Sequence, residues 1–326
     1  MPVIDKENVN AWPTPYASAE DLGYRGAKNP FAAMDYNENL NKSMRVLTNF
    51  YAKIDFIPKK LSFKSTYNQA YTNFNERNVG LPFYISNNSQ REESVLTKIA
   101  STYNNIIWDN VLTFTNTFAS DHNLVLMAGT SYRQESGQWL RAQGINFPVD
   151  PEQAWYINLS ETIPVTEVND GGSRQYGLSY FGRASYNYKY KYLVYATMRA
   201  DGSSKYQEKW GYFPSVGLGW VLSEEGFLEN NDAVSFMKLR ASWGQLGNDK
   251  IQASDGATTT TVVNTAIDDV LTPGTITSST FSSLKWEVVE EFNIGITTRF
   301  MESRLSAEVD YYNRKTKNAV IRVQVP

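Results

Sequence analysis

The stretch RQYGLSYFGRASYNYKY (residues 174–190) decides the predicted fold, because its side chains alternate between two kinds. One set of alternate positions is mostly aromatic or small: Tyr176, Leu178, Tyr180, Gly182, Ala184, Tyr186, Tyr188 and Tyr190. The other set is mostly polar: Gln175, Gly177, Ser179, Phe181, Arg183, Ser185, Asn187 and Lys189. Side chains that alternate with a period of two face opposite sides of a β-strand. The segment therefore predicts a strand with one apolar face and one polar face.

The same alternation recurs at residues 44–56, 286–300 and 304–314. Strands of soluble proteins are usually about 5–6 residues long, whereas a tilted strand that crosses a membrane needs about 9–11. The alternating runs reach or exceed the second length. Their length favours a transmembrane β-barrel over a soluble sandwich or propeller.

Ten strands are predicted, and the connections between them sort by length. The strands are expected at about 43–57, 60–74, 92–119, 123–138, 174–188, 191–202, 211–222, 235–246, 284–300 and 304–318. Short connections at 58–59, 120–122, 189–191, 223–234 and 301–303 alternate with longer ones at 75–91, 139–173, 203–210 and 247–283. This parity is typical of barrels with short periplasmic turns and long outer loops. We predict an all-β fold, an antiparallel transmembrane β-barrel segment.

Composition excludes several classes of function. The net charge of -3 gives no electrostatic basis for nucleic-acid binding. Cysteine is absent, which excludes disulfides, thiolate metal sites and cysteine nucleophiles. Aromatic residues make up 14% of the chain and cluster near predicted strand ends, which favours interfacial aromatic girdles over aromatic packing inside a sandwich.

No residue pattern points to catalysis, a metal or a cofactor. The single histidine, His122, falls in a predicted tight turn with few converging partners. Glu290 and Glu291 are adjacent on a strand and so face opposite sides. Glu290 falls on the apolar face, so either it lies near the membrane boundary or a bulge shifts the register there. We predict that the chain is not an enzyme.

Two glycine-containing motifs are given structural roles. Asp201-Gly202-Ser203-Ser204 is expected to form a turn at a strand exit, with Asp201 capping backbone amides and Gly202 at positive φ. Gly217 and Gly219 lie within a predicted strand, where small residues leave room in a barrel lumen for a plug.

An ordered set of motifs resembles the SusC/RagA family of TonB-linked outer-membrane proteins. The set comprises YFGRASYNYKYKYLVYATMRADGSSKY (180–206), GYFPSVGLGW (211–220), SEEGFL (223–228), KLRASWGQLGN (238–248), LKWEVVEEFNIGI (284–296) and DYYNRKTKN (310–318). Together they cover about 176–318. The likeness is looser upstream, at NPFAAMD (29–35), LSFKSTYN (61–68) and DHNLVLMAG (121–129).

The resemblance implies a fragment of a barrel of about 22 strands. Residues 1–41 would be an outer loop after an upstream strand, and 42–326 part of the barrel. The family's plug domain and TonB-engaging segment have no counterpart in the chain.

The resemblance also implies a function. The whole protein would import oligosaccharides or peptides across the outer membrane of a Gram-negative bacterium, surrounded by lipid, driven by TonB and covered by a SusD-like lipoprotein. Candidate contacts with the ligand or that lid are the loop aromatics Trp139, Phe147, Trp155, Tyr156 and Trp210; plain loop packing is an equal explanation for them.

A second function is a soluble β-rich domain that binds or hydrolyses carbohydrate. It differs from the first in one structural respect, because a soluble domain would bury its apolar face against a second layer of protein. The exposure of that face therefore separates the two hypotheses.

Overall fold

The computed structural model describes residue 16 and residues 30–87, 89–148, 156–228, 231, 233–251, 259–267, 270–280 and 284–319. For residues 30, 32, 33, 259–267 and 270–280 it describes the backbone alone. The chain divides into two compact units, which are treated separately. Unit 1 takes the described parts of 1–47, 70–104 and 136–173, and unit 2 those of 48–69, 105–135 and 174–326.

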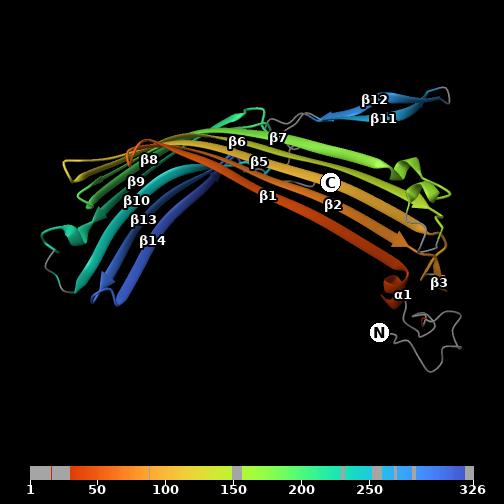
Figure 1. Cartoon of the computed structure of the whole chain (residues 1–326), viewed down its shortest axis with the longest axis horizontal. Coiled ribbons are helices and arrows are strands. Elements are labelled where there is room, and N and C mark those ends of the chain that lie inside the picture. Colours follow the sequence, from red (N-terminus) through yellow and green to blue (C-terminus); the bar gives the residue numbers. More distant parts are fainter. Residues whose placement is uncertain are drawn as a thin grey trace. The chain divides into compact units, whose positions relative to one another are not determined.

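Ten strands form one sheet in the order β1-β2-β5-β6-β7-β8-β9-β10-β13-β14 (Figure 1). Their bounds are Asn37–Ile57 (β1), Leu61–Gly80 (β2), Val95–Phe118 (β5), His122–Ile145 (β6), Asn169–Tyr188 (β7), Tyr192–Ser203 (β8), Trp210–Val221 (β9), Val234–Asn248 (β10), Glu287–Phe300 (β13) and Leu305–Lys317 (β14). Successive strands are neighbours, and the pairs from β7 to β14 are antiparallel. All ten predicted strands are present, and the predicted all-β, antiparallel class is confirmed.

Short connections contain tight reversals with left-handed backbone. The pairs Ala119-Ser120 and Lys189-Tyr190 have φ of 48°, 62°, 52° and 56°. Two successive residues at positive φ match the right-handed twist of the flanking strands. For residues other than glycine this conformation costs about 1–2 kcal/mol each, so the strand pairing on either side must offset it.

Two hairpins were not predicted. β3 (Phe83–Ser86) pairs with β4 (Ser89–Arg91), and β11 (Thr259–Ile267) pairs with β12 (Val270–Thr280). Both lie in expected long loops. Four strands also extend by five or more residues into expected loops: β1 begins at Asn37, β2 ends at Gly80, β6 ends at Ile145 and β7 begins at Asn169. The added residues of β2 are mostly polar on both faces, so alternation does not mark them, whereas the added part of β6 does alternate, with Leu140 and Ala142 opposite Arg141 and Gln143.

Helices are few in the described chain. α1 spans Pro30–Asp35, and the 3-10 turns η2 (Ile157–Leu159), η3 (Val165–Glu167) and η4 (Leu222–Glu224) lie in connections. None of these helical segments has the length and hydropathy needed to cross a bilayer.

Unit 1 has a small apolar core beside its long connections. Val79, Leu96 and Phe147 are 1%, 0% and 4% exposed and pack together, with Leu81 and Ile157 against them. Ser94 Oγ donates to the Phe147 backbone oxygen at 3.0 Å. The connection after β6 is therefore held against β2 and β5.

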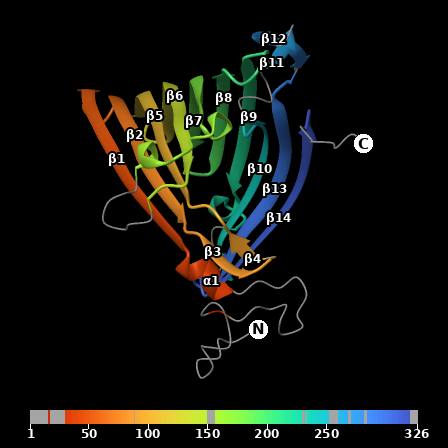
Figure 2. The same cartoon turned by 90° about the vertical axis from the view of Figure 1, so that its right-hand side faces the viewer.

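Unit 2 carries the two-faced strands predicted from sequence. Directly paired residues run in a row across six neighbouring strands, seen side by side in Figure 2: Tyr186, Val194, Leu218, Ala241, Ile294 and Tyr311. The large apolar members remain in the open, with Leu218 55%, Ile294 46% and Tyr311 63% exposed. Among the described residues, no second layer of protein covers this face, which we call the apolar face.

Aromatic rings line the short-turn end of the apolar face. Tyr188, Tyr192 and Trp220 occupy one row, and Tyr192 stacks on both of the others. In the following turn, Glu225 Oε1 accepts hydrogen bonds from Tyr192 Oη at 2.6 Å and Trp220 Nε1 at 3.0 Å. These two donors lower the pKa of the Glu225 carboxyl. The carboxylate therefore orients two rings of a predicted girdle.

Candidate ligand-binding face

The opposite side of unit 2, which we call the polar face, carries its hydrogen-bonding groups. The row adjacent to the apolar one reads Ser185, Tyr195, Gly217, Ser242, Asn293 and Tyr312. A Cβ at Gly217 would collide with the Tyr195 ring. The space above Gly217 is thus occupied by a neighbouring side chain, where we had expected it to be open for a plug.

A cavity of about 420 Å³ opens on the polar face. Its lining is dominated by charged and hydroxyl side chains: Ser131, Arg133, Ser179, Arg199, Asp201 and Asp249, with Ile107, Leu246 and Trp286 as its large apolar members. Such a mixture of a few placed polar groups and apolar surface is typical of ligand sites. The cavity is the strongest candidate site on this face.

The cations of the cavity are held by carboxylates. Arg199 Nε donates to both carboxylate oxygens of Asp201, at 2.7 and 2.8 Å, and its Nη2 donates to Ser179 Oγ at 3.0 Å. Arg133 pairs with Asp249 and lies 3.6 Å from Glu135. Paired charges present fixed donors and acceptors with little net charge, an arrangement that suits a polar, uncharged or zwitterionic ligand.

A second ion cluster on this face depends on one glycine. Gly295 of β13 is paired with Arg240 of β10 on one side and Asp310 of β14 on the other. Arg240 Nη2 reaches across it to Asp310 Oδ1 and Oδ2 at 2.8 and 2.6 Å, and also pairs with Glu308. A Cβ at Gly295 would collide with Asp310 Oδ1. Glycine therefore allows an ion pair that spans three strands.

Aromatic side chains form a small core at the long-loop end of unit 2. Tyr206, Phe213 and Trp286 are 2%, 4% and 8% exposed. Trp286 stacks on Tyr206 at 4.7 Å between ring centroids and meets Phe213 edge to face at 5.5 Å. Tyr206 Oη donates to the Asn248 backbone oxygen at 2.9 Å. The connection between β8 and β9 is thereby fixed to the end of β10 and the start of β13.

The Tyr206 hydroxyl is kept neutral by its surroundings. Burial, followed by the nearby carboxylates of Asp249 and Glu287, raises the pKa of Tyr206 to about 12. Lys205 Nζ donates to the Asp249 backbone oxygen at 2.9 Å. Tyr206 and Lys205 thus bind the backbone at Asn248 and Asp249, and Asp249 lines the cavity.

The four predicted contact residues that the structure describes have different surroundings. Trp139 is 40% exposed in β6, and Tyr156 is 62% exposed in the following connection. Phe147 is 4% exposed and belongs to the unit 1 core, so its ring is closed to ligand. Trp210 stacks on Tyr180 at 5.9 Å on the apolar face. Trp155 lies outside the described residues.

Sequence reasoning missed the charged residues of the cavity. Arg199 and Asp201 occupy alternate positions on the polar face of β8. Their alternation is visible in the sequence and could have identified them as lumen-facing residues. The partner of Arg133, Asp249, is 116 residues away, and no local pattern links them. The expected turn role of Asp201 is wrong, because Asp201 lies within β8 and binds Arg199. The expected positive φ of Gly202 is also wrong.

The register settles the one position that the sequence left open. The pairing of β13 with β10 and β14 is unbroken at Glu290, which lies near the start of β13. Glu290 is therefore on the apolar face and accepts hydrogen bonds from Gln245 at 3.0 Å and Lys317 at 2.7 Å. The expected turn position of His122 is wrong, because His122 begins β6, where its Nδ1 lies 2.6 Å from Tyr186 Oη and its ring contacts Phe118 and Tyr188.

Comparison with known proteins shows consistent similarity along the chain. The family described as TonB dependent receptor-like, beta-barrel matches residues 5–326. The TonB-dependent receptor P26 of Formosa agariphila is 27% identical over 347 aligned positions, which cover 99% of this chain and 34% of the relative. The TonB-dependent receptor SusC of Bacteroides thetaiotaomicron is 33% identical over 183, covering 53% of this chain and 18% of the relative.

Solved structures show the same fold. The structure of the RagAB peptide transporter has a TM-score of 0.82 and 23% sequence identity, over 93% of this chain and 34% of that one. The RagAB peptide importer in its open-open state has a TM-score of 0.81. The chain thus spans about a third of P26 and of the RagAB chain it matches.

Proposed function

Because the chain belongs to the TonB-dependent receptor-like β-barrel family, we propose that it forms part of the wall of an outer-membrane transporter for large nutrients. The transporter lies in the outer membrane of a Gram-negative bacterium and draws its energy from TonB. Residues 42–326 contribute barrel wall, and the plug and the TonB-engaging segment belong to other parts of the full-length protein.

The exposed apolar face of unit 2 carries this proposal. Val194, Leu218, Ile294, Val309 and Tyr311 are 41–65% exposed on paired, neighbouring strands. Soluble proteins rarely leave contiguous apolar patches larger than a few hundred Å² in water. A barrel wall would place the apolar face against membrane hydrocarbon and the polar face against the water of the lumen, so that each face would meet a solvent that suits it. A soluble carbohydrate-binding or hydrolytic domain would need a covering layer that the described residues do not supply.

The composition of the polar face favours a polar ligand in the lumen. Its cavity offers Ser131 and Ser179 beside the charge pairs of Arg133 with Asp249 and Arg199 with Asp201. Oligosaccharides and peptides both carry many neutral hydrogen-bonding groups, and both suit fixed donors and acceptors of low net charge. We assign the substrate to these two classes and the covering partner to a SusD-like lipoprotein. Likeness to SusC and to the RagAB peptide transporter supports this assignment.

Membrane fractionation and uptake test the function. The full-length protein is expressed in a Gram-negative host lacking its own copy. It should be released from the outer membrane only by detergent, and uptake of labelled oligosaccharides or peptides should stop when TonB is deleted. Recovery in the aqueous fraction would favour the soluble alternative, and uptake that persists without TonB would contradict energised transport.

Loop aromatics are the proposed contacts with ligand or lid. Trp139, Trp155 and Tyr156 remain in this group, because Phe147 is buried and Trp210 lies on the apolar face. Loss of one ring contact of about 0.5–1.5 kcal/mol should weaken binding by about 2–10-fold in Tyr156→Ala or Trp155→Ala. Tyr212→Ala, which removes an equally exposed tyrosine from the apolar face, is the control. Unchanged affinity in the first two variants would remove those residues.

A further inference from the structure

Unit 2 carries a cavity of about 470 Å³ on its apolar face. Its lining comes from β8, β9, β10 and β13 and includes Tyr192, Val194, Leu218, Trp220, Ala241 and Ile294. Arg240 also borders the cavity, but its guanidinium lies on the polar face, where it is bound to Asp310. The surface of this cavity is therefore apolar.

The cavity spans one half of the bilayer in depth. Tyr192 begins β8 and Trp220 is next to last in β9, so both rings lie at the short-turn end. Ile294 lies about 15 Å along the membrane normal from Phe300, at the same end of β13, for a rise of about 3.4 Å per residue and a strand tilt of about 40°. One leaflet of hydrocarbon is about 15 Å thick, half of a core of about 30 Å. The cavity therefore has the depth of one acyl chain, in the leaflet on the short-turn side.

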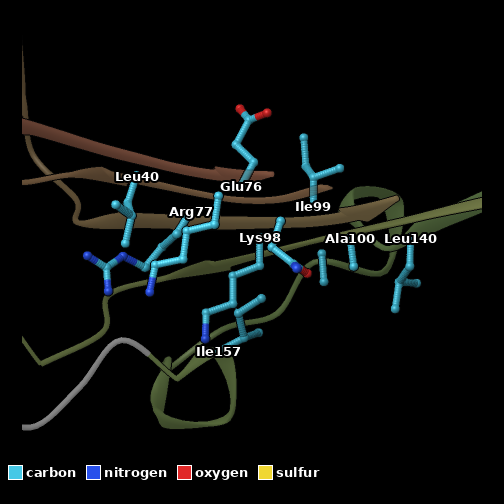
Figure 3. A pocket seen from close by; sticks show the side chains of 11 residues that line it. Leu40, Glu76, Arg77, Lys98, Ile99, Ala100, Leu140 and Ile157 are labelled. Carbon is cyan, nitrogen blue, oxygen red and sulfur yellow. The ribbon is translucent and has the colours of Figure 1, made fainter. Parts of the chain in front are cut away.

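The apolar cavity of unit 1 lies at a different level along the strands. Leu140 and Ile157 line it, with Arg77 and Lys98 beside them (Figure 3). By the same rise and tilt, Lys98 lies about 50 Å along the normal from Phe118, the short-turn end of β5. An apolar band about 25 Å tall ends well before that level. The cavity of unit 1 is therefore too far from the short turns to hold an acyl chain.

A loosely paired cation and anion lie at the short-turn end of the unit 2 cavity. Glu225 Oε1 accepts the hydrogen bonds of Tyr192 and Trp220, and both of these residues line the cavity. Lys191 Nζ lies 3.9 Å from Glu225 Oε2, which is too far for a hydrogen bond. No other donor among the described residues bonds to that oxygen. The Lys191 ammonium and Glu225 Oε2 therefore both retain hydrogen-bonding capacity.

We propose that the unit 2 cavity binds an acyl chain of a phospholipid with a primary-ammonium headgroup, of the phosphatidylethanolamine type, in the periplasmic leaflet. The lipid phosphate meets the Lys191 ammonium, and the lipid ammonium donates to Glu225 Oε2. A short linker joins the two charges of this headgroup, so they match the protein pair in sign and in closeness. A choline headgroup has no N–H to donate, and a glycerol headgroup has no cation. The inference rests on the proposed function, because only a membrane-embedded protein meets this lipid and short turns face the periplasm.

Native mass spectrometry of the full-length protein tests the proposal. The detergent-solubilised protein is titrated separately with palmitoyl-oleoyl phosphatidylethanolamine, phosphatidylcholine and phosphatidylglycerol, which share both acyl chains. We expect the ethanolamine lipid to be retained in preference to the other two. E225Q should weaken its binding by about tenfold, through loss of one charge-assisted hydrogen bond, and leave binding of the choline lipid unchanged. K191Q should weaken the binding of both lipids by about fivefold, because both carry the phosphate.

Control variants separate the headgroup contacts from the acyl-chain contacts. E224Q removes the exposed carboxylate that precedes Glu225, and K98Q removes the lysine beside the unit 1 cavity. Neither variant should change the binding of any of the three lipids. K191R retains the charge and should retain binding. A241F fills the cavity with an apolar side chain that hydrocarbon tolerates, so it should weaken the binding of the ethanolamine and choline lipids alike.

Heat-dependent gel mobility shows whether each variant has folded. The amide oxygen in E225Q can still accept from both rings; if this variant does not fold, K191Q and A241F carry the test. Equal retention of the three lipids, an unchanged ratio of ethanolamine to choline lipid in E225Q, or undiminished binding by K191Q or A241F overturns the proposal. Detergent-dependent extraction without a lipid preference refutes this inference alone, whereas extraction without detergent refutes the proposed function.

Discussion

Arginine placed at the centre of the apolar face should destabilise the protein far more than arginine one residue away. Ile294 lies near the middle of β13, paired with Ala241 and Tyr311 on the apolar face. Asn293 precedes it and pairs with Ser242 and Tyr312 on the polar face. The variants Ile294→Arg and Asn293→Arg therefore add the same charge to the same strand on opposite sides.

The depth of Ile294 sets the magnitude. From Phe300, at the short-turn end of β13, to Ile294 the chain rises about 20 Å at about 3.4 Å per residue. With a strand tilt of about 40°, that is about 15 Å along the membrane normal, close to the middle of an apolar band about 25 Å tall. Arginine facing lipid at the midplane costs about 2–4 kcal/mol. A substitution on an exposed surface in water usually changes stability by about 0.5 kcal/mol or less.

Urea unfolding of the full-length protein in phospholipid vesicles, followed by tryptophan fluorescence, measures the difference. We expect Ile294→Arg to lower the free energy of unfolding by about 2–4 kcal/mol and Asn293→Arg by less than about 1 kcal/mol. If the two variants agree within about 0.5 kcal/mol, Ile294 does not face hydrocarbon, and the interpretation of the apolar face is refuted.

Three further outcomes are expected. Gly295→Ala should lower the free energy of unfolding by about 1–3 kcal/mol, because the added Cβ displaces Asp310 from the three-strand ion pair. The control Gly226→Ala should be neutral, because nothing lies within 4 Å of its added Cβ. Equal effects of the two substitutions would contradict this prediction. Trp286→Ala should lower the free energy of unfolding by about 3–5 kcal/mol and make the connection between β8 and β9 susceptible to limited proteolysis. An unchanged cleavage rate would show that the aromatic core does not hold this connection in place. The pKa of Tyr206 is about 12 in the folded protein and 10.0 for the free side chain. The neutral hydroxyl therefore stabilises the fold fully below pH 10.0, and this stabilisation is lost as the pH rises toward 12. The urea midpoints of the wild type and Tyr206→Phe should converge over that pH range, and a constant difference between them would refute the shift.

Local alternation was enough to predict the ten strands and their two faces. The side-chain period of a strand is a property of the chain itself, so residues 174–190 and 286–300 reveal strand, length and face without any partner. The parity of short and long connections followed from the same pattern. The outer end of β2 escaped prediction because polar residues occupy both faces there. The outer end of β6 does alternate, with Leu140 and Ala142 on one face, and its signal was missed. The β3–β4 and β11–β12 hairpins lie inside expected loops.

The candidate sites depend on which strands pair and in which register. Arg240 meets Asp310 only because Gly295 lies between them in a three-strand row, and Arg133 meets Asp249 across 116 residues of chain. Burial of Phe147 and the apolar-face position of Trp210 are likewise properties of packing. The amino-acid sequence by itself determined the strands, their two faces and the class of protein, since alternation is local. Tertiary structure alone decided which charges pair and which rings remain open, because those contacts join side chains that are distant along the chain.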